Sequence, residues 1–430
     1  MEKQKCPELR FEGFDDGWQE KALNEIFIPL PNNTLSRADL NYDNGDIKNI
    51  HYGDILVKYT AVLDYKKDKI PFITEGKISD FKSQFLRDGD VIFADTAEDE
   101  SAGKAIEING VDDNYIVSGL HTMAYRPRIK LSPYYLGHYL NSNAYHHQLL
   151  SLMQGIKVLS VSRTNIAKTI VKYPASEKEQ AQIGELFQNL DQSIALHEKK
   201  LAQTQNFKQA MLEKMFPKQG GKRPEIRLKG FSRDWHSSKL SDYISIKHGF
   251  AFNGEFFSDK ETDYCLLTPG NFMIGGGFKA EKFIYYKGEV PKNYILKEND
   301  LIVTMTDLSK ESDTLGLPAL LPSIAGKTLL HNQRLGFIIF ENLELEKEFL
   351  FYLLQTKSYH KYIVLSATGT TVKHTSPSKI LGFTCKIPEP TEQKKIGEFF
   401  QKIDEKINLH QQQLQTLKNL KQAFLEKMFV

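Results

Sequence analysis

Several short stretches of this sequence carry side chains suited to recognising a ligand by hydrogen bonding rather than to making or breaking bonds. Two of them are alike in layout, GIKVLSVSR at 155–163 and GTTVKHTSPSK at 369–379, and a third is HNQR at 331–334. A fourth, at 118–128, contains His121 followed by two arginines. Amide and guanidinium groups can form paired hydrogen bonds, while lysine and hydroxyl groups can bind phosphate oxygens. These stretches predict a binding surface.

Motifs of catalysis are missing from the sequence. The segment AGKT at 325–328 resembles the end of a phosphate-binding loop, but the first glycine of that motif would fall at Leu321. No HExxH, GxSxG, paired CxxC or [ND]PP[FY] segment occurs. The ExK triplet at 75–77 ends a nuclease-like pattern, but such triplets arise by chance in a lysine-rich chain. We therefore predict a protein that is not itself an enzyme.

Bulk composition is that of an ordinary globular chain of two or three domains. The 430 residues include 56 basic and 54 acidic side chains, so the net charge of +2 does not by itself indicate a nucleic-acid ligand. No apolar run is long enough for a membrane span, and the N-terminus lacks the apolar core of a signal peptide. Three distant cysteines indicate neither a disulfide framework nor a zinc site. We expect a cytoplasmic protein without a metal site.

The chain contains an internal duplication. PELRFEGFDDGW at 7–18 returns as PEIRLKGFSRDW at 224–235, which is 217 positions later. The segment at 183–216 returns at 396–429, with about 19 of 34 positions identical and QA-x-LEKMF kept whole. Two copies of a unit of about 215 residues therefore lie end to end. This period is too long for a solenoid or a propeller.

The body of each copy has diverged, although landmarks remain. GDVI at 89–92 corresponds to NDLI at 299–302, and the GIKV and GTTV tetrapeptides correspond as well. Alternating runs at 89–95 and 300–306 predict strands, and the segments at 132–153 and 346–365 predict helices. The predicted class is α+β, with two mixed α/β bodies. The long repeated segments are alike in the two copies, whereas the bodies between them differ. The repeated segments therefore serve a function common to both copies, and the bodies serve one that differs between them.

The repeated segment predicts a long helix with a heptad seam. Apolar residues recur at alternating spacings of four and three over more than four heptads, which is typical of a coiled coil. The seam positions are Ile183, Phe187, Leu190, Ile194, His197, Leu201, and in the second copy Ile396, Phe400, Ile403, Ile407, His410 and Leu414. A 34-residue helix is about 51 Å long.

Such a helix needs a partner, and two arrangements are open. Each helix could pack only on its own body, or the two helices could pair with each other, for which pseudo-symmetry favours the antiparallel direction. We favour pairing because the stripe is narrow and regular. His197 and His410 occupy equivalent seam positions, and we interpret them as fixing the register rather than binding a metal. The two ends of the chain resemble the halves of the central linker, as in a ring cut open there.

Two similar bodies on stiff helices could act as a ruler. Modules that read the same face of duplex DNA lie about 34–36 Å apart, which is a separation that helices of about 51 Å can hold. Diverged bodies would then read two different half-sites with an unread gap. The main alternative is a protein-binding scaffold with a coiled-coil assembly arm, which would be indifferent to DNA.

The sequence resembles the specificity subunit of type I restriction–modification systems over essentially its whole length. The matching features are the two PE-x-R-x-x-GF…W openings, the Glu-Gln-x-x-Ile-Gly helix starts at 179–184 and 392–397, and the two LEKMF ends. The resemblance implies target recognition domains at 1–173 and 224–387. It implies conserved helical spacers at 174–216 and 388–430, joined by a linker at 217–223.

The same resemblance implies the partners and cofactors. They are double-stranded DNA, two adenine methyltransferase (modification) subunits held through the helical spacers, and restriction subunits that act as translocase and nuclease. S-adenosylmethionine would be bound by the modification subunits, and ATP and Mg by the restriction subunits, so that this chain holds no cofactor.

We expect the hydrogen-bonding stretches to contact DNA. Arg, Asn and Gln can discriminate base edges, and Lys and hydroxyl groups can anchor phosphates. A solvated turn or a structural strand edge is the alternative for each stretch. The predicted DNA-binding residues are Lys157, Ser160, Ser162, Arg163, His121, Arg126, His331, Asn332, Gln333, Arg334, Thr370, Thr371, Lys373 and His374.

Overall fold

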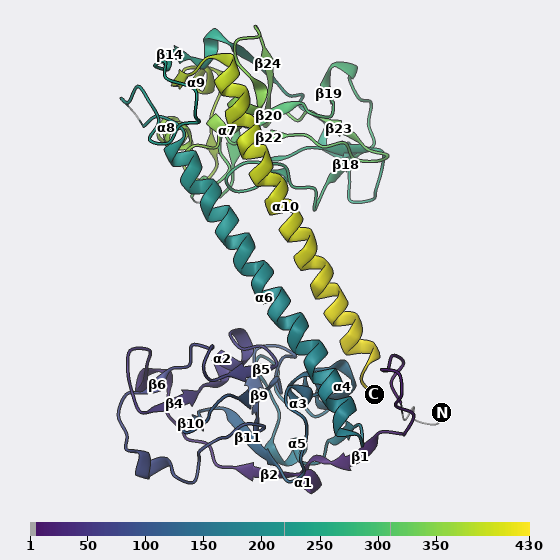
Figure 1. Ribbon diagram of the computed structural model, residues 1–430. Coiled ribbons are helices and arrows are strands. Elements are labelled where there is room, and N and C mark those ends of the chain that lie inside the picture. Colours follow the sequence, from purple (N-terminus) through teal and green to yellow (C-terminus); the bar gives the residue numbers. More distant parts are fainter. Residues whose placement is uncertain (1–5, 219, 310) are drawn as a thin grey trace. The chain divides into compact units, whose positions relative to one another are not determined.

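A computed structural model describes residues 6–218, 220–309 and 311–430, which fold as two compact units (Figure 1). Unit 1 combines the chain up to Lys199 with Gln411–Val430, and unit 2 is formed by Lys200–His410. Each unit therefore contains one mixed α/β body together with parts of two long helices, α6 (Glu177–Lys214) and α10 (Pro390–Lys427).

Unit 1 is built on a five-stranded and a four-stranded sheet. The five-stranded sheet has the order β2 (Phe27–Leu30), β11 (Thr122–Pro127), β7 (Val91–Ala94), β9 (Ala105–Asn109) and β5 (Val62–Asp64). The four-stranded sheet has the order β10 (Tyr115–Ser118), β4 (Ile47–Ile50), β6 (Phe72–Ile73) and β3 (Leu40–Asn41). Two small pairs are β1 (Gln19–Ala22) with β13 (Ile170–Tyr173) and β8 (Thr96–Ala97) with β12 (Leu159–Ser160). The short helices are α1 (Leu23–Ile26), α2 (Tyr52–Val57), α3 (Tyr135–Leu140), α4 (Asn143–Leu150) and α5 (Arg163–Ile166).

Unit 2 repeats this plan with different strand lengths. Its four-stranded sheet has the order β15 (Ile244–His248), β24 (Leu335–Phe340), β20 (Leu301–Thr304) and β22 (Pro318–Leu320). Its five-stranded sheet has the order β16 (Phe257–Ser258), β18 (Ile284–Tyr286), β17 (Tyr264–Leu266), β23 (Thr328–Leu330) and β19 (Ile295–Leu296). The small pairs are β14 (His236–Lys239) with β26 (Thr384–Ile387) and β21 (Thr306–Asp307) with β25 (Lys373–His374). The short helices are α7 (Lys347–Leu353), α8 (Lys357–Ser366) and α9 (Pro377–Leu381).

The strands and helices expected from the sequence are confirmed. All four residues of β7 and all four of β20 are buried, as their apolar runs predict for central strands. The preceding turns explain the shared landmark, because Gly89 and Asn299 both have positive φ, which glycine and asparagine tolerate best. The two predicted helical segments each form a pair of short helices, α3–α4 and α7–α8.

In unit 1 the end of α10 closes the core. The Phe429 ring stacks on Phe187 of α6 at 5.4 Å and lies 5.9 Å and 5.7 Å from the rings of Tyr135 and Tyr139. Trp18 of the opening segment completes the cluster at 6.3 Å. The LEKMF end of the second helix is thus part of the core of the first body.

In unit 2 the end of α6 packs into the core in the same way. The Phe216 ring lies 6.1 Å from Phe400 of α10, 5.4 Å from Phe349 and 6.2 Å from Trp235. These residues belong to one buried cluster with Ile396 and Ile403. Each body therefore packs against the start of the helix that follows it in the chain and the end of the other long helix.

Inside each unit the two helical segments run antiparallel (Figure 1). In unit 1, Asp191 binds Lys421 at 2.5 Å and Glu198 binds Lys418 at 2.8 Å, so the numbering rises on one helix as it falls on the other. In unit 2, Lys208 binds Asp404 at 2.7 Å. The predicted class, with two mixed α/β bodies and long antiparallel helices, is confirmed.

The predicted seam faces inward with different degrees of burial. Buried positions are Ile183, Phe187, Leu190, Ile396, Phe400, Ile403 and His410; half-buried positions are Ile194, His197, Leu201, Ile407 and Leu414. The helices begin earlier than the repeat suggested, at Glu177 and Pro390. The linear boundaries expected for recognition domains and spacers remain a prediction.

Replacing either helix-end phenylalanine should destabilise one unit selectively. Phe429→Ala removes a buried ring from unit 1, and Phe216→Ala removes one from unit 2, each at a cost of about 3–5 kcal/mol. Hydrogen exchange followed by mass spectrometry should be faster in β7 and β11 for the first variant and in β20 and β24 for the second. Leu196→Ala, at a half-exposed position, is the control and should change little. Faster exchange in the opposite unit would contradict this assignment.

Candidate nucleic-acid interface

A short hairpin projects from unit 1 at residues 154–160. Its arms are joined by two backbone hydrogen bonds of 2.9 Å between Gln154 and Ser160. β12, in the second arm, pairs with β8, where the Thr96 hydroxyl donates to the Leu159 carbonyl oxygen at 3.2 Å. Residues 155–158 are exposed at the tip. The predicted contact residues Lys157 and Ser160 are therefore accessible.

Unit 2 has the equivalent hairpin at residues 368–374. Thr368 and His374 exchange backbone hydrogen bonds of 3.0 and 2.8 Å, and β25 pairs with β21. Thr370 and Thr371 are exposed at the tip. Lys373 is half-buried, whereas His374 is exposed and its Nδ1 lies 3.3 Å from the Thr306 hydroxyl.

A glycine fixes the turn of both hairpins. Gly155 has φ of +119° and Gly369 has φ of +96°. A Cβ atom would lie 1.9 Å from the Val158 carbonyl oxygen in the first and 2.0 Å from the Val372 carbonyl oxygen in the second, closer than any real contact. The G-x-x-V landmark thus encodes one turn geometry, in which only glycine fits. The two residues between are Ile-Lys in one hairpin and Thr-Thr in the other.

The residues that follow the first hairpin are engaged within the protein. The Ser162 hydroxyl caps α5 by accepting from the Asn165 amide at 3.2 Å. The Arg163 guanidinium donates to the Leu30 carbonyl oxygen at 3.1 Å and lies over the Tyr125 ring at 5.5 Å. Ser162 remains exposed and Arg163 half-buried. Their contact with DNA stays a prediction, and both already have structural partners within unit 1.

The residues of the HNQR stretch at 331–334 differ in burial: the first two are buried in unit 2 and the last two are exposed. His331 is buried, its Nε2 lies 2.9 Å from the Leu335 carbonyl oxygen, and burial lowers its pKa to about 4. It is therefore neutral at physiological pH and is not accessible from the surface. Asn332 is also buried, whereas Gln333 and Arg334 are exposed in the turn before β24. The last two are the side chains that a ligand can reach.

The corresponding turn of unit 1 leaves His121 exposed and Arg126 engaged. His121 has positive φ, and its Nδ1 lies 3.2 Å from the Asp95 carboxylate, whose pKa is raised by burial. The Arg126 guanidinium binds both oxygens of the fully buried Asp90, at 2.8 and 2.6 Å, and donates to the Phe85 carbonyl oxygen. Arg126 thus neutralises a buried carboxylate, and its predicted DNA contact is untested.

A buried ion pair that sequence reasoning did not single out ties each opening segment to a long helix. In unit 1, the Arg10 guanidinium binds both oxygens of Glu179 at 2.7 and 2.8 Å, and the hydrogen bond to Glu179 raises the pKa of Arg10. It also donates to the Asp16 carbonyl oxygen at 2.7 Å, and the Trp18 Nε1–H donates to Glu179 at 3.3 Å.

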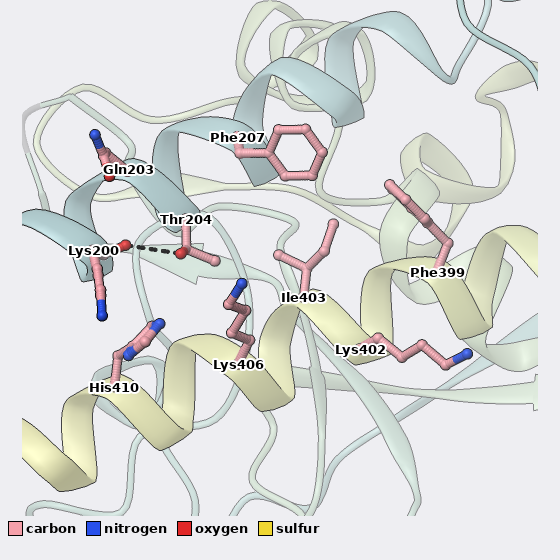
Figure 2. Close-up of a pocket in the computed structure, with 9 residues that line it drawn as sticks. All are labelled: Lys200, Gln203, Thr204, Phe207, Phe399, Lys402, Ile403, Lys406 and His410. Atoms are coloured by element: carbon pink, nitrogen blue, oxygen red, sulfur yellow. Dashed lines mark hydrogen bonds between the residues drawn. The ribbon is translucent and has the colours of Figure 1, made fainter. Parts of the chain in front are cut away.

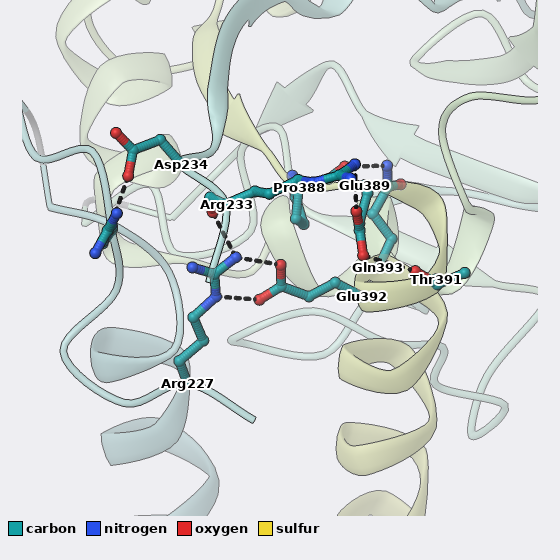
Figure 3. A network of polar contacts seen from close by, with 9 residues as sticks. Arg227, Arg233, Asp234, Pro388, Glu389, Thr391, Glu392 and Gln393 are labelled. Carbon is teal, nitrogen blue, oxygen red and sulfur yellow. Dashed lines mark hydrogen bonds and ion pairs between the residues drawn. The ribbon is translucent and has the colours of Figure 1, made fainter. Parts of the chain in front are cut away.

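Unit 2 repeats the pair with Arg227 and Glu392 (Figure 3). The two hydrogen bonds are both 2.7 Å, and the Arg227 guanidinium also donates to the Arg233 carbonyl oxygen at 2.6 Å. Next to this pair, the Gln393 amide donates to the Pro388 carbonyl oxygen at 2.9 Å and accepts from the Glu346 amide at 2.8 Å. The repeated PE-x-R and Glu-Gln motifs were the signal for this arrangement.

The opening segments also meet the helix ends. The Ile226 amide donates to the Lys214 carbonyl oxygen at 2.9 Å in unit 2, where a linker joins the two segments. In unit 1 the Leu9 amide donates to the Lys427 carbonyl oxygen at the same distance, although these residues are far apart in the sequence.

A second charged network lies along each helix pair. In unit 1, Asp191 accepts from His138 at 2.9 Å and from Lys421; burial alone would raise the pKa of Asp191, but these two partners hold it below its ordinary value.

In unit 2 the Tyr352 hydroxyl donates to Asp404 at 2.9 Å and Lys208 binds the same carboxylate. Lys421 of α10 and Lys208 of α6 therefore have carboxylate partners, which a heptad pattern of apolar residues does not indicate.

A membrane-spanning helix and a metal-binding cluster are both absent from the described part of the chain. Within residues 6–218, 220–309 and 311–430, no helix is both long and apolar enough to span a membrane. The same residues contain no group of three or more His, Cys, Asp or Glu side chains that could hold a metal ion.

Comparison with known proteins agrees with this pseudo-symmetric plan. The chain is 24% identical over 287 residues to the MjaVIII type I restriction enzyme specificity subunit of Methanocaldococcus jannaschii, covering 64% of this chain and 65% of the relative. It is 26% identical over 195 residues to the EcoBI specificity subunit of Escherichia coli, covering 44% of this chain and 38% of the relative. The matches thus span slightly less than two thirds of the first relative and under half of the second.

Solved structures show the same fold. The type I restriction–modification S subunit of M. genitalium matches with a TM-score of 0.60 at 10% identity, covering 99% of both chains. A chain from a study of complex assembly and conformational transition of the type I R-M system matches with a TM-score of 0.54 at 16% identity, covering 97% and 98%. The sequence model described as "Type I restriction modification DNA specificity domain" matches twice, at residues 15–206 and 232–419. Because the two matches to this family model together cover most of the chain, the chain belongs to the type I restriction modification DNA specificity family.

Proposed function

We propose that this chain is the DNA-recognition component of a type I restriction–modification complex and reads an asymmetric site in two parts, one for each unit. The observation that carries the proposal is the pair of glycine-locked hairpins, at 154–160 and 368–374, which have the same turn geometry and different tip residues. The constant backbone places exposed side chains at equivalent positions of both units, where they can hold each unit against the same kind of ligand. The differing turns around His121 and at 331–334 can then read two different sequences.

The accessible side chains suit this task. Lys157, Thr370 and Thr371 lie at exposed tips and can bind phosphate oxygens. Gln333 and Arg334 are exposed in unit 2 and can pair with adenine and guanine edges respectively. We assign phosphate anchoring to the hairpin tips and base reading to the turn at 331–334.

The long helices would bind the partners. In this proposal they hold two modification subunits, which use S-adenosylmethionine to methylate adenine, and the chain itself supplies positioning and no catalysis. Restriction subunits would join through the same complex and use ATP and Mg. We place this activity in the cytoplasm.

Removing a base-reading side chain should change one half-site only. Gln333→Ala or Arg334→Ala in a complex with the cognate modification subunit should relax selection at one or two positions of one half-site, with a loss of about 1–3 kcal/mol for the preferred base. Selection of bound duplexes from a randomised pool measures this. Arg233→Ala, whose side chain is 87% exposed near the start of α10, should leave the selected sequence unchanged. An unaltered preference in both half-sites would remove Gln333 and Arg334 from the reading surface.

Removing a tip lysine should weaken binding to all sequences alike. Lys157→Ala should lower DNA affinity uniformly and reduce the slope of log affinity against log salt by about one, because one phosphate contact is lost. Titration of labelled duplexes at several salt concentrations gives the slope. Lys21→Ala, an exposed lysine on β1, is the matched control and should keep the wild-type slope. A variant whose base preference changes while its slope stays constant would contradict the assignment.

Lengthening both helices together should change the gap between the half-sites and nothing else. Four residues inserted after Lys199 and four after Gln412, at matching points of α6 and α10, add about 6 Å of helix, equal to a base pair or two. Selection from a randomised pool should return both half-sites with a longer gap. If either half-site changes its sequence, the helices do not act as the ruler.

A further inference from the structure

An apolar groove with a basic rim lies between the two long helices within unit 2 (Figure 2). Its volume is about 580 Å³. The floor contains Phe207 of α6, which is 47% exposed, and Phe399 and Ile403 of α10, with the two aromatic rings 6.4 Å apart. A contiguous apolar patch of this kind with a polar rim is typical of a protein-binding surface.

Three lysines surround this floor. Lys200, Lys402 and Lys406 are all exposed, and none of them forms an ion pair with any residue that the structure describes. The nearby acidic residue Asp404 is already bound by Lys208 at 2.7 Å. The rim therefore carries three positive charges that form no ion pair within the described part of unit 2.

The matching face of unit 1 is also apolar, with leucines in place of the phenylalanines, but it lacks the charge. The repeat places Leu420 and Leu186 at the positions of Phe207 and Phe399, and Leu420 is 41% exposed. The three lysines are replaced by Gln413, Asn189 and Ser193. One helix-pair face is therefore basic and the other neutral, although both derive from one ancestral repeat.

We propose that this groove is a charge-assisted docking site for an acidic protein segment, and that the chain consequently binds its two copies of one partner with unequal affinity. The inference rests on the proposed function, which supplies two identical modification subunits for two pseudo-equivalent faces. The segment presents an apolar side chain to the Phe207–Phe399–Ile403 floor and carboxylates to the three lysines.

A protein segment fits the groove better than DNA does. Lysines bind DNA through phosphates, which would leave the adjoining phenylalanines without an apolar partner. An acidic segment with an apolar anchor satisfies both features at once. Rim charges of this kind act mainly through long-range attraction, so their contribution falls with salt.

The test compares the two binding steps of the cognate modification subunit. The full chain is titrated with that subunit and the one-copy and two-copy complexes are quantified by native mass spectrometry at 50 and 300 mM salt. After correction for the statistical difference between filling the first and the second of two sites, we expect dissociation constants that differ by about tenfold or more at low salt and converge at high salt. Equal constants at low salt would overturn the inference.

Variants that exchange residues between equivalent positions of the two units control for misfolding, because each new residue already occurs at the matching position of the other unit. The triple variant Lys200→Gln, Lys402→Asn and Lys406→Ser copies the residues of unit 1 into unit 2 and should abolish the difference at low salt. The reciprocal variant Gln413→Lys, Asn189→Lys and Ser193→Lys should bring the weaker step close to the stronger one. A difference that survives the first variant would overturn the inference.

A DNA titration of the same triple variant tests whether the three lysines bind DNA instead of a protein segment. Unchanged DNA affinity supports the protein site. A loss of DNA affinity at unchanged subunit affinity would mean that the lysines face DNA, which overturns the inference but leaves the proposed function standing. A chain that binds no modification subunit at all would remove both.

Discussion

Insertion of a phenylalanine from the end of each long helix into an aromatic core is the contact on which both units depend. A helix of 38 residues with a narrow apolar stripe gains most of its stability from packing, so its ends must be secured. Phe429 and Phe216 do this by joining the clusters around Phe187 and Phe400. The same LEKMF sequence therefore builds one core made of neighbouring segments and another made of segments from opposite ends of the chain.

The buried ion pairs Arg10–Glu179 and Arg227–Glu392 hold each opening segment in one position on its long helix. Glu179 and Glu392 have almost no solvent contact, so each needs the bidentate guanidinium that Arg10 or Arg227 provides. Removing one partner of such a pair is costly, about 3–5 kcal/mol, because the other charge stays buried. The pair thus fixes where the opening segment meets the helix. A rigid frame of this kind lets the hairpin tips and turns vary without loss of the fold.

Much of the architecture could be predicted from the sequence because it is local or repeated. Helical periodicity predicted α6 and α10. The repeated G-x-x-V was recognisable as a correspondence between the two copies, and the structure explains it through the turns at Gly155 and Gly369. Orientation of polar side chains could not be predicted, because it depends on partners distant in the sequence. Arg126 is bound by Asp90, 36 positions away, and His331 is turned into the core beside exposed Gln333. Lys208 and Lys421 of the long helices are likewise bound by Asp404 and Asp191, which lie far from them in the sequence.

We propose that the two diverged recognition units, which share the two long helices, read the two halves of a DNA site. The most direct measurement is single-base mapping of methyladenine in the genome of a host without adenine methylation that expresses this chain with its cognate modification subunit. If the chain reads DNA in two parts, methyladenine will fall in one motif with two defined parts and a fixed unread gap between them. If the two proteins co-purify and the modification subunit binds its cofactor, but the genome gains no methyladenine, the chain does not direct methylation and is instead a protein-binding scaffold.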